Sequence, residues 1–238
     1  MKGIILAGGN ATRLRPLTLV TSKQLLPVYD KPMIFYPLQT LLDAGIRDIL
    51  VIVAPTYAGH FLHLLGSGKQ FNARITYEIQ EEPRGLADAF IIGEDFMDHD
   101  NVTMILGDNI FPADVAKQIA DFQRGGRVFA YKVPDPERYG VVQFDDHQKA
   151  VRIEEKPKEW ISDYAITGLY VYDNRVAQFA REVQPSARGE IEITELHKRY
   201  LDLGELDVRF VDGKWFDAGT FDSLLDASNH IAEQHRKP

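Results

Sequence analysis

The sequence contains no cysteine among its 238 residues. This absence excludes a disulfide framework, a thiolate metal site and a cysteine nucleophile. Long apolar runs are also missing: none approaches the roughly 20 residues of a membrane helix, and the stretch after Met1 is too short for the core of a signal peptide. We therefore expect a cytoplasmic protein that has no membrane partner.

Positive charge is scarce overall, because 27 lysines and arginines face 35 acidic residues and give a formal net charge of −8. A generally basic surface for nucleic acid is therefore excluded, and any anionic ligand must be met by a local group of cations. The first 31 residues contain such a group, with five cations and a single acid, Asp30. This asymmetry predicts a site for a small anion near the N-terminus.

Apolar patterning in the first half of the chain predicts strands that alternate with helices, as in a parallel sheet covered by helices. The predicted strands are residues 3–6, 48–53, 74–79 and 102–106. The predicted helices are residues 33–44, 60–65 and 86–96. Gly45 is expected to end the first of these helices. This half is therefore expected to be α/β.

The pattern changes after Asp108, where turn residues separate four apolar runs and little helix is expected. These runs predict an antiparallel extension of the sheet. They are residues 128–133, 140–144, 151–154 and 165–172. The helices expected after them are residues 176–182, 193–203 and 221–233, with a further strand at 206–211. No linker is long enough to divide the chain, so residues 1–238 are predicted to form a single domain.

The first strand runs into a glycine-rich loop, Leu6-Ala7-Gly8-Gly9-Asn10-Ala11-Thr12-Arg13-Leu14-Arg15-Pro16. Paired glycines let the backbone approach an anion closely, and successive backbone N–H groups in such a turn form a nest of phosphate size. Arg13 adds a forked, charged hydrogen-bond donor. The loop matches neither GxGxxG nor GxxxxGK[ST], which disfavours an ordinary dehydrogenase or a P-loop NTPase. The alternative is a plain glycine-rich turn between two elements.

Three further charged residues stand next to turns. Lys23 lies in Ser22-Lys23-Gln24-Leu25-Leu26-Pro27, and its nearness in sequence to Arg13 favours an anion contact over a solvated surface charge. Asp108 follows a predicted strand, at the strand end where open α/β sheets bind ligands. Asp217 precedes a Gly-Thr turn into the last helix, where a helix cap is the alternative role. A Mg²⁺ ion on a triphosphate typically takes one or two protein carboxylates, so these two acids would suffice.

Two further pairs of residues lie just after predicted strands. Glu155 and Lys156 are an adjacent acid and base: a carboxylate accepts hydrogen bonds from two sugar hydroxyls while a lysine meets a phosphate. The alternative is a surface ion pair. Gln80 ends the third predicted strand and Gly85 precedes the helix after it. A terminal amide there would read a pyrimidine edge as donor and acceptor at once, and an exposed polar cap is the alternative.

Seven motifs occur in order along nearly the whole chain. They are Leu6-Ala7-Gly8-Gly9-x-x-Thr12-Arg13-Leu14-x-Pro16, Ser22-Lys23-Gln24-Leu25-Leu26-Pro27, Leu106-Gly107-Asp108-Asn109, Tyr139-Gly140-Val141-Val142, Glu154-Glu155-Lys156-Pro157, Thr167-Gly168-Leu169-Tyr170 and Pro185-Ser186-Ala187-Arg188-Gly189-Glu190. Together they resemble the bacterial glucose-1-phosphate thymidylyltransferases of dTDP-rhamnose synthesis. The resemblance implies a three-layer αβα, Rossmann-like nucleotidyltransferase fold with a mixed, mostly parallel central sheet and a small antiparallel extension.

The resemblance also implies an activity, the Mg²⁺-dependent joining of dTTP and glucose 1-phosphate to give dTDP-glucose and pyrophosphate, in a homo-oligomer. The half up to about residue 110 would bind the nucleotide, and the half from residue 111 the sugar phosphate. The residues implied for the nucleotide are Leu6, Gly8, Gly9, Asn10, Ala11, Thr12, Arg13, Gln80, Gly85 and Asp108. Those implied for the sugar phosphate are Lys23, Gly140, Glu155, Lys156, Ile166 and Arg188. Arg13 and Lys23 would be catalytic, and Asp108 and Asp217 would hold the metal.

Two features depart from the family pattern. Ala11 stands where the family loop usually has a third glycine, so a backbone geometry open only to glycine is either unavailable there or not required. The sequence also ends where long members continue into helices that help to form an allosteric site, so we expect a short form with weak, competitive feedback inhibition. Two alternatives remain. One is a uridylyltransferase, because thymine and uracil share the groups that Gln80 would bind. The other is a non-catalytic nucleotide-sugar sensor.

We predict that Arg13→Ala lowers kcat/KM for dTTP at least about tenfold more than Arg15→Ala does. The motif match assigns Arg13 to the triphosphate and leaves Arg15 at a variable position of the loop. Steady-state kinetics on both variants measure the difference. Equal losses would mean that this interpretation of the loop is wrong.

Overall fold

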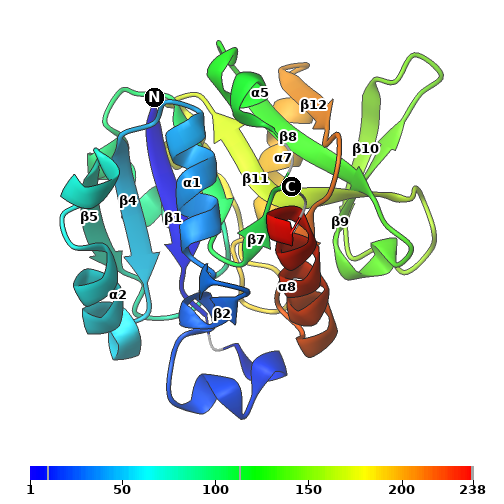
Figure 1. The fold of residues 1–238 in the computed structure, drawn as a ribbon. Helices are drawn as coiled ribbons and strands as arrows, with labels where there is room; N and C mark the ends of the chain where they lie inside the picture. Colours follow the sequence, from blue (N-terminus) through cyan, green and yellow to red (C-terminus); the bar gives the residue numbers. More distant parts are fainter. Residues whose placement is uncertain (10, 113, 237–238) are drawn as a thin grey trace.

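The apolar runs of the sequence form strands, and these build one mixed sheet in the computed structural model, which describes residues 1–9, 11–112 and 114–236 (Figure 1). Within those residues the sheet has nine strands; seven follow the order β10-β9-β11-β6-β1-β4-β5, while β8 pairs with β11 and β12 pairs with β8. The strands are β1 (Lys2–Ala7), β4 (Asp48–Val53), β5 (Arg74–Ile79), β6 (Val102–Leu106), β8 (Gly126–Lys132), β9 (Gly140–Phe144), β10 (Ala150–Glu155), β11 (Tyr164–Tyr172) and β12 (Leu206–Phe210).

Four neighbouring strands, β5, β4, β1 and β6, run parallel. Their apolar runs are continuous because helices cover both faces of a parallel sheet. Ile4, Ile5, Val51 and Ile52 are accordingly all completely buried. The strand prediction for this half is confirmed: β4, β5 and β6 have the predicted boundaries, and β1 is one residue longer at each end.

The remaining strands form the predicted antiparallel extension. β11 runs antiparallel to β6, β8 and β9, and β9 and β10 form an antiparallel hairpin at the edge of the molecule (Figure 1). β12 returns parallel to β8. The sheet is therefore mixed, and its four-stranded parallel part comes from the N-terminal half of the chain, as the sequence predicts.

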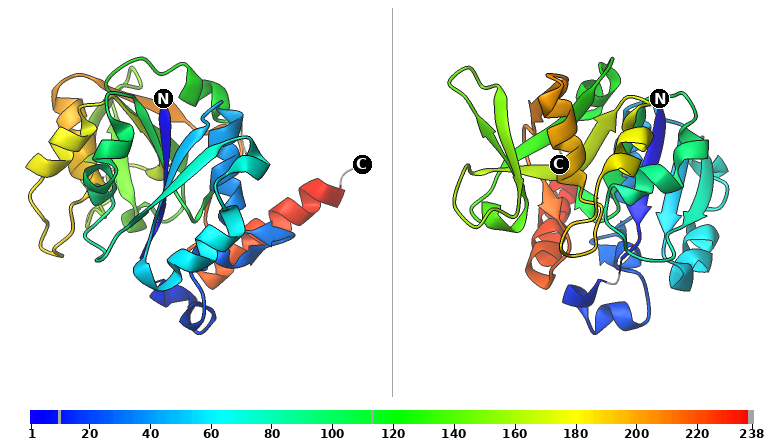
Figure 2. Two further views of the ribbon diagram at one scale, coloured as in Figure 1. Left: turned by 90° about the vertical axis from the view of Figure 1, so that its left-hand side faces the viewer. Right: turned by 180° about the vertical axis from the view of Figure 1, so that it is seen from behind.

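Helices cover both faces of the sheet and complete the three layers (Figure 2). On one face, Leu38, Phe61 and Ile119 share a core with the strand residues Ile5 and Val51. They belong to α1 (Phe35–Asp43), α2 (Ala58–Leu65) and α5 (Ala116–Ala120). The opposite face is covered by α3 (Asp88–Ile92), α4 (Glu94–Met97), α6 (Val176–Glu182) and α7 (Ile193–Asp202). No helix in the described part of the chain is long and apolar enough to cross a membrane.

The last helix, α8 (Phe221–Arg236), packs apart from these layers, and its C-terminal end extends away from them (Figure 2). Ala227 and Ile231 on α8 share a small core with Val28, Met33 and Ile110. That core also joins two short antiparallel pairs. These are β2 (Pro27–Val28) with β3 (Lys31–Pro32), and β7 (Asn109–Ile110) with β13 (Phe216–Asp217).

Three features differ from the sequence prediction. The single helix expected at residues 86–96 is wrong, because α3 and α4 are separate and meet at Gly93. A Cβ there would lie 3.0 Å from Ile4 Cδ1 and 3.1 Å from Leu50 Cδ2, so the close packing on the sheet favours a glycine, which weakens a helix. The sequence pattern does not predict α5, which buries only Ile119. The sequence analysis also misses the two-residue strands β2, β3, β7 and β13 and the six 3₁₀ helices of the described residues. Segments of two or three residues are too short to show a periodic pattern.

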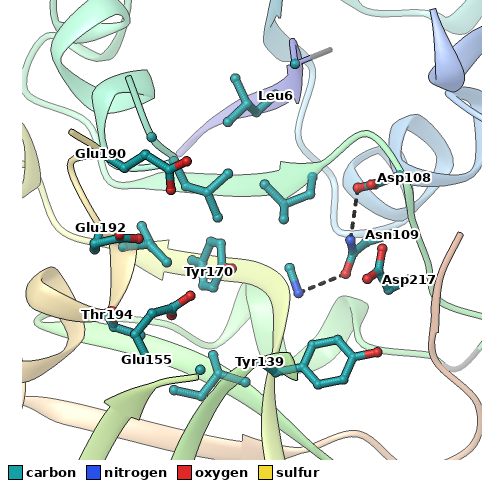
Figure 3. A pocket seen from close by; sticks show the side chains of 18 of the residues that line it. Leu6, Asp108, Asn109, Tyr139, Glu155, Tyr170, Glu190, Glu192, Thr194 and Asp217 are labelled. Carbon is teal, nitrogen blue, oxygen red and sulfur yellow. Dashed lines mark hydrogen bonds between the residues drawn. The ribbon is translucent and has the colours of Figure 1, made fainter. Parts of the chain in front are cut away.

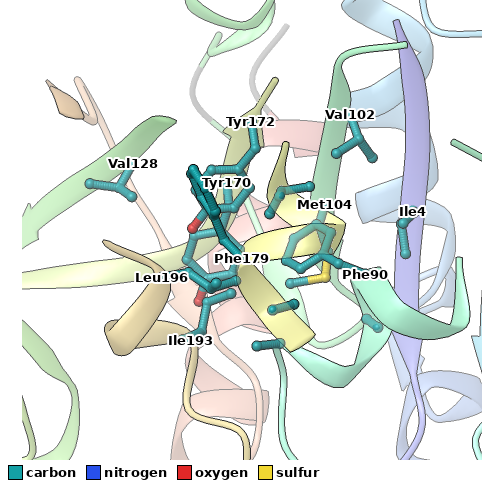
Figure 4. Packing of buried hydrophobic residues seen from close by; sticks show 14 of the residues in the cluster. Ile4, Phe90, Val102, Met104, Val128, Tyr170, Tyr172, Phe179, Ile193 and Leu196 are labelled. Carbon is teal, nitrogen blue, oxygen red and sulfur yellow. The ribbon is translucent and has the colours of Figure 1, made fainter. Parts of the chain in front are cut away.

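A buried aromatic cluster joins the two halves of the sheet (Figure 4). Tyr172 of β11 stacks on Tyr200 of α7 with ring centroids 5.2 Å apart. Phe90 of α3 meets Tyr172 edge-on at 5.3 Å, and Phe179 of α6 meets Tyr200 edge-on at 5.2 Å. Such pairs stabilise a core beyond the area that they bury. The cluster therefore fixes α3 and α7, which flank the cavity described below.

Asp173 connects three parts of the chain beside this cluster. It is almost completely buried. Its carboxylate accepts hydrogen bonds from the Gly125 N–H at 3.0 Å, the Tyr200 hydroxyl at 3.0 Å and Arg175 Nη2 at 2.6 Å. Burial alone would raise the pKa of Asp173, but the hydrogen bonds from Arg175, Gly125 and Tyr200 lower it below its usual value.

We predict that Asp173→Asn lowers the free energy of unfolding at pH 7 by about 2–4 kcal/mol, because it leaves buried donors without their charged acceptor. A depressed carboxyl pKa stabilises the fold above the unfolded pKa of about 3.9, so the difference from wild type should shrink as the pH falls below that value. Urea unfolding at several pH values measures it. Asp202→Asn, an exposed change on α7, is the control and should be neutral. A neutral Asp173→Asn would contradict the assignment.

Candidate active site

A cavity of about 350 Å³ opens at the carboxyl ends of β1, β5 and β6, the edge at which open α/β sheets bind ligands. The predicted site residues that line it are Leu6, Gly8, Gly9, Arg13, Lys23, Gln80, Gly85, Asp108, Gly140, Glu155, Lys156, Ile166, Arg188 and Asp217. Ala11 and Thr12 do not line the cavity, and Asn10 lies outside the described residues. The structure therefore gathers fourteen predicted residues from both halves of the chain.

The glycine-rich loop turns sharply after β1. Gly9 has a φ of 96°, which glycine adopts freely. Gly8 has no room for a side chain, since a Cβ there would lie 2.9 Å from Gln80 Oε1. Ala11 has φ 44° and ψ 40°, the left-handed conformation that costs an L-residue about 1–2 kcal/mol. This chain therefore has an alanine in a left-handed conformation that a glycine would adopt without strain.

Lys23 and Asp108 form an ion pair in the cavity wall. Lys23 Nζ donates a hydrogen bond to Asp108 Oδ2, and the two side chains are only 17% and 9% exposed. Burial alone would raise the pKa of Asp108, but the Lys23 ammonium and the Asn109 amide lower it below its usual value. Asp108 is therefore an anion throughout the neutral range.

Asn109 holds the loop that carries Asp108 against two other segments. Its Oδ1 accepts hydrogen bonds from the Gly168 N–H at 2.8 Å and from Trp215 Nε1 at 2.7 Å, and its Nδ2 donates to Asp108 Oδ1 at 3.2 Å. Gly168 leaves no room for a side chain, because a Cβ would lie 2.5 Å from Asn109 Oδ1. One buried amide thus connects β6, β11 and the segment before β13.

The β7–β13 pairing brings Asp217 beside Asp108. Asp217 lies opposite Asn109 in the pair, and the Ala218 N–H donates a hydrogen bond to the Asp108 carbonyl oxygen at 2.9 Å. Figure 3 shows Asp108, Asn109 and Asp217 on the same side of the pocket. Two acids from distant parts of the sequence therefore share one wall.

Asp217 lies among charges of both signs. A Cβ at Gly219 would lie 2.8 Å from Arg13 Nη2 and 3.0 Å from Asp217 Oδ1, so the guanidinium and the carboxylate both lie against this glycine. Burial, and then the negative charge of Asp108, raise the pKa of Asp217 to about 6 against the opposing effects of Lys23 and Arg13. The two carboxylates repel each other, and a bound cation would remove that repulsion.

The opposite side of the cavity carries three glutamates, Glu155, Glu190 and Glu192 (Figure 3), and these pair with two cations. Arg188 Nη2 lies 2.8 Å from Glu192 Oε1 and 3.5 Å from carboxylate oxygens of Glu155 and Glu190. Lys156 Nζ lies 3.5 Å from Glu155 Oε1. The residues that the sequence implies for a sugar phosphate are therefore adjacent, and in this structure their positive charges are balanced by internal acids.

Polar groups without a protein partner lie behind this side of the cavity. A Cβ at Gly140 would lie 2.8 Å from Thr194 Cγ2 and 3.3 Å from Glu155 Oε2, so these side chains use the space that a glycine leaves. The Thr194 hydroxyl and both ring nitrogens of His197 are buried and make no hydrogen bond within the described residues. Burial lowers the pKa of His197 to about 3, so its ring is neutral.

Sequence reasoning leaves several lining residues unassigned. They include Gln24, Asn109, Arg138, Tyr139, Tyr170, Glu190, Glu192, Thr194, His197 and Trp215. Some of them, such as Asn109 and Tyr170, stand inside the motifs quoted above, so the signal for them was present. His197 and Trp215 stand outside those motifs and reach the cavity through packing of distant segments.

Residues 2–234 match the family described as nucleotidyl transferase, and the chain therefore belongs to that family. It is 54% identical over 237 residues to the glucose-1-phosphate thymidylyltransferase of Neisseria meningitidis serogroup A, and 54% identical over 236 residues to that of Mycolicibacterium smegmatis. Each alignment covers 97% of this chain and 82% of the relative. Within the nucleotidyl transferases, the chain belongs to the glucose-1-phosphate thymidylyltransferase family.

Solved structures agree with this placement. A Bacillus anthracis protein, described as a candidate glucose-1-phosphate thymidylyltransferase and solved with sucrose, superposes with a TM-score of 0.92 at 44% identity and covers 97% of this chain and 94% of its own. A UDP-glucose pyrophosphorylase solved with UDP-glucose has a TM-score of 0.85 at 23% identity, with 98% of each chain covered. The second likeness shows the fold alone.

We predict that Asp217→Asn raises the melting temperature of the metal-free protein at pH 8 by a few degrees, because it removes the repulsion between two buried carboxylates. A carboxyl whose folded pKa is raised to about 6 destabilises the fold above that pH and is protonated below it. The gain should therefore shrink at pH 5. Thermal unfolding in a chelator at both pH values tests this, and an equal or absent gain would contradict it.

Proposed function

We propose that this chain transfers a thymidylyl group from dTTP to glucose 1-phosphate, with Mg²⁺, and releases dTDP-glucose and pyrophosphate. The relatives named above support the two substrates. The observation that carries the proposal is the division of charge in the cavity. Asp108, Asp217, Lys23 and Arg13 lie on one side, and Lys156 and Arg188 lie with the acids on the other.

A site for two anionic substrates needs such an arrangement. The nucleotide would bind at Leu6, the glycine-rich loop from Gly8 to Arg13, Gln80 and Gly85. The sugar phosphate would bind at Lys23, Gly140, Glu155, Lys156, Ile166 and Arg188. Residues 1–110 and 111–238 would thus supply the two halves of one catalytic domain. Repulsion between the phosphates is the main electrostatic barrier to their approach, and the cations Arg13, Lys23, Lys156 and Arg188 would act against it.

The two aspartates fit a Mg²⁺ ion. They are hard oxygen ligands in one wall, and the charge of Asp108 disfavours ionisation of Asp217 until a cation compensates both. Asp108 and Asp217 would hold the ion, which would supply charge neutralisation at the phosphate oxygens. Lys23, whose ammonium group is paired with the Asp108 carboxylate in this structure, would then be free to contact phosphate.

The transfer itself needs no general base from the protein. A phosphate monoester has a second pKa near about 6, so glucose 1-phosphate is mostly a dianion at neutral pH and is already nucleophilic. One of its oxygens forms a bond to the α-phosphorus of dTTP while the bond from that phosphorus to the oxygen bridging the α- and β-phosphates breaks, and pyrophosphate leaves with that oxygen. The protein's contribution is then to align the two substrates and to stabilise the charge on both phosphates. The neutral His197 is consistent with a site that does not depend on proton transfer.

Release of pyrophosphate from glucose 1-phosphate and a panel of triphosphates, with and without Mg²⁺, tests the proposal. We expect dTTP to give the highest kcat/KM and the metal to be required. A preference for UTP would indicate a uridylyltransferase instead, since thymine and uracil differ at the C5 methyl group. Binding of nucleotide sugar without any pyrophosphate release would indicate a sensor. We further propose that the enzyme works as a cytoplasmic homo-oligomer in dTDP-sugar synthesis of the rhamnose type.

We predict that Asp108→Asn and Asp217→Asn each lower kcat by at least about a hundredfold, because each removes a charged ligand from the metal. Steady-state kinetics with a Mg²⁺ titration measure the effect. Asp222→Asn is the matched control, an exposed acid in the first turn of α8 that should leave kcat unchanged. Near-wild-type, Mg²⁺-dependent turnover in either cavity variant would exclude that aspartate as a ligand.

A further inference from the structure

The Gln80 side chain is oriented by hydrogen bonds inside the protein. It lies in the cavity wall at the end of β5 and is 7% exposed. Its Nε2 donates to Asp88 Oδ2 at 2.9 Å and to the Gly85 carbonyl oxygen at 3.4 Å. An amide nitrogen carries two hydrogens, so both donors of Gln80 are used by the protein itself.

The chemistry of Asp88 permits only one orientation of this amide. Asp88 is completely buried, and its other oxygen accepts a hydrogen bond from Arg84 Nη2 at 2.8 Å. An ionised carboxylate accepts hydrogen bonds but donates none, so it cannot pair with Gln80 Oε1. An amide flip is normally decided by its hydrogen-bonding network, and here the network contains two acceptors around Nε2.

The group that Gln80 leaves for a ligand is therefore its carbonyl oxygen. A Cβ at Gly8 would lie 2.9 Å from Gln80 Oε1, so this oxygen faces the glycine-rich loop. Gly8, Gly85 and Gln80 all line the same cavity. A ligand in this part of the cavity meets a hydrogen-bond acceptor.

We propose that Asp88 is a positioning residue that sets the base specificity of the nucleotide site, because it holds the Gln80 amide with its acceptor toward the base. The inference rests on the proposed function, which puts a nucleobase at Gln80. Thymine and uracil carry an N–H donor at N3, whereas neutral cytosine carries an acceptor there. Cytosine would bring two acceptors together, and a buried mismatch of this kind is strongly rejected. Gln80 thus acts as an acceptor only, and not as donor and acceptor at once.

The matched pair dUTP and dCTP tests this, since the two differ only in the groups at N3 and C4. With glucose 1-phosphate, the wild type should favour dUTP by at least about a hundredfold in kcat/KM. In Asp88→Asn, the oxygen of the new amide should face Arg84 and its NH₂ group should face Gln80. Gln80 then turns over and offers donors to the base. We expect the preference for dUTP to fall at least tenfold, through a higher kcat/KM for dCTP as well as a lower one for dUTP.

Two further variants distinguish a changed orientation of the Gln80 amide from a general loss of structure. Arg84→Met leaves Asp88 as an acceptor, and Arg84 does not itself line the cavity, so its dUTP:dCTP ratio should equal that of the wild type. Asp88→Ala removes the acceptor without adding a donor, and its ratio should lie between those of the wild type and Asp88→Asn. If Asp88→Asn does not fold, an Asp88→Ala ratio equal to the wild type overturns the inference. Equal losses for both nucleotides in Asp88→Asn also overturn it.

Calorimetry with dUDP and dCDP measures nucleotide binding without turnover, so it tests this inference separately from the proposed function. A wild type that binds dUDP far more tightly than dCDP without turnover, together with a smaller difference in Asp88→Asn, would support the role of Asp88 while the proposed transfer fails. Turnover with dUTP and dCTP at similar kcat/KM would support the transfer and exclude Asp88 as the residue that sets base specificity. Wild-type protein that binds neither diphosphate would contradict both.

Discussion

The repulsion between Asp108 and Asp217 is the interaction around which the cavity is organised. The β7–β13 pair holds both acids in one wall, where burial and the neighbouring charge raise the pKa of Asp217 to about 6. Two partly desolvated like charges cost stability, and Lys23 and Arg13 offset only part of that cost. Carboxyl groups whose pKa values are strongly shifted cluster at functional sites. Under the proposed function, a cation held by the two carboxylates would offset this repulsion.

The wall in turn depends on Asn109, which connects segments that are distant in the sequence. Its amide oxygen holds the Gly168 backbone and the Trp215 indole, and its nitrogen holds Asp108. Because Gly168 belongs to β11 and Trp215 precedes β13, one buried side chain aligns three elements at the cavity. Buried polar networks of this type are stabilising only when every group is satisfied, so the position of Asp108 is coupled to the packing of the C-terminal half.

Much of the fold and part of the site follow from the sequence. Strands buried on both faces need continuous apolar runs, and the boundaries of β4 at Asp48–Val53 were predictable for that reason. The glycine-rich loop and Asp108 were predictable because they end such strands. The Asn109 contacts and the orientation of Gln80 were not, because they depend on which distant segments meet. The break at Gly93 was missed for the same reason: periodicity continues through it, and only contact with the sheet explains the glycine.

The two ion-pair groups of the cavity differ in how easily a substrate would displace them. Arg188 is 43% exposed in its contact with Glu192, and an exposed ion pair contributes only about 0–1 kcal/mol, so a phosphate dianion could take this arginine at little cost. The Lys23–Asp108 pair is largely shielded, and breaking a buried pair leaves a charge uncompensated at a cost of several kcal/mol. Under the proposed function, the sugar-phosphate side would exchange partners readily. Lys23, by contrast, would leave Asp108 only when another cation replaces it. The same two acids that repel each other in this wall would therefore make release of Lys23 toward a substrate phosphate conditional on the metal.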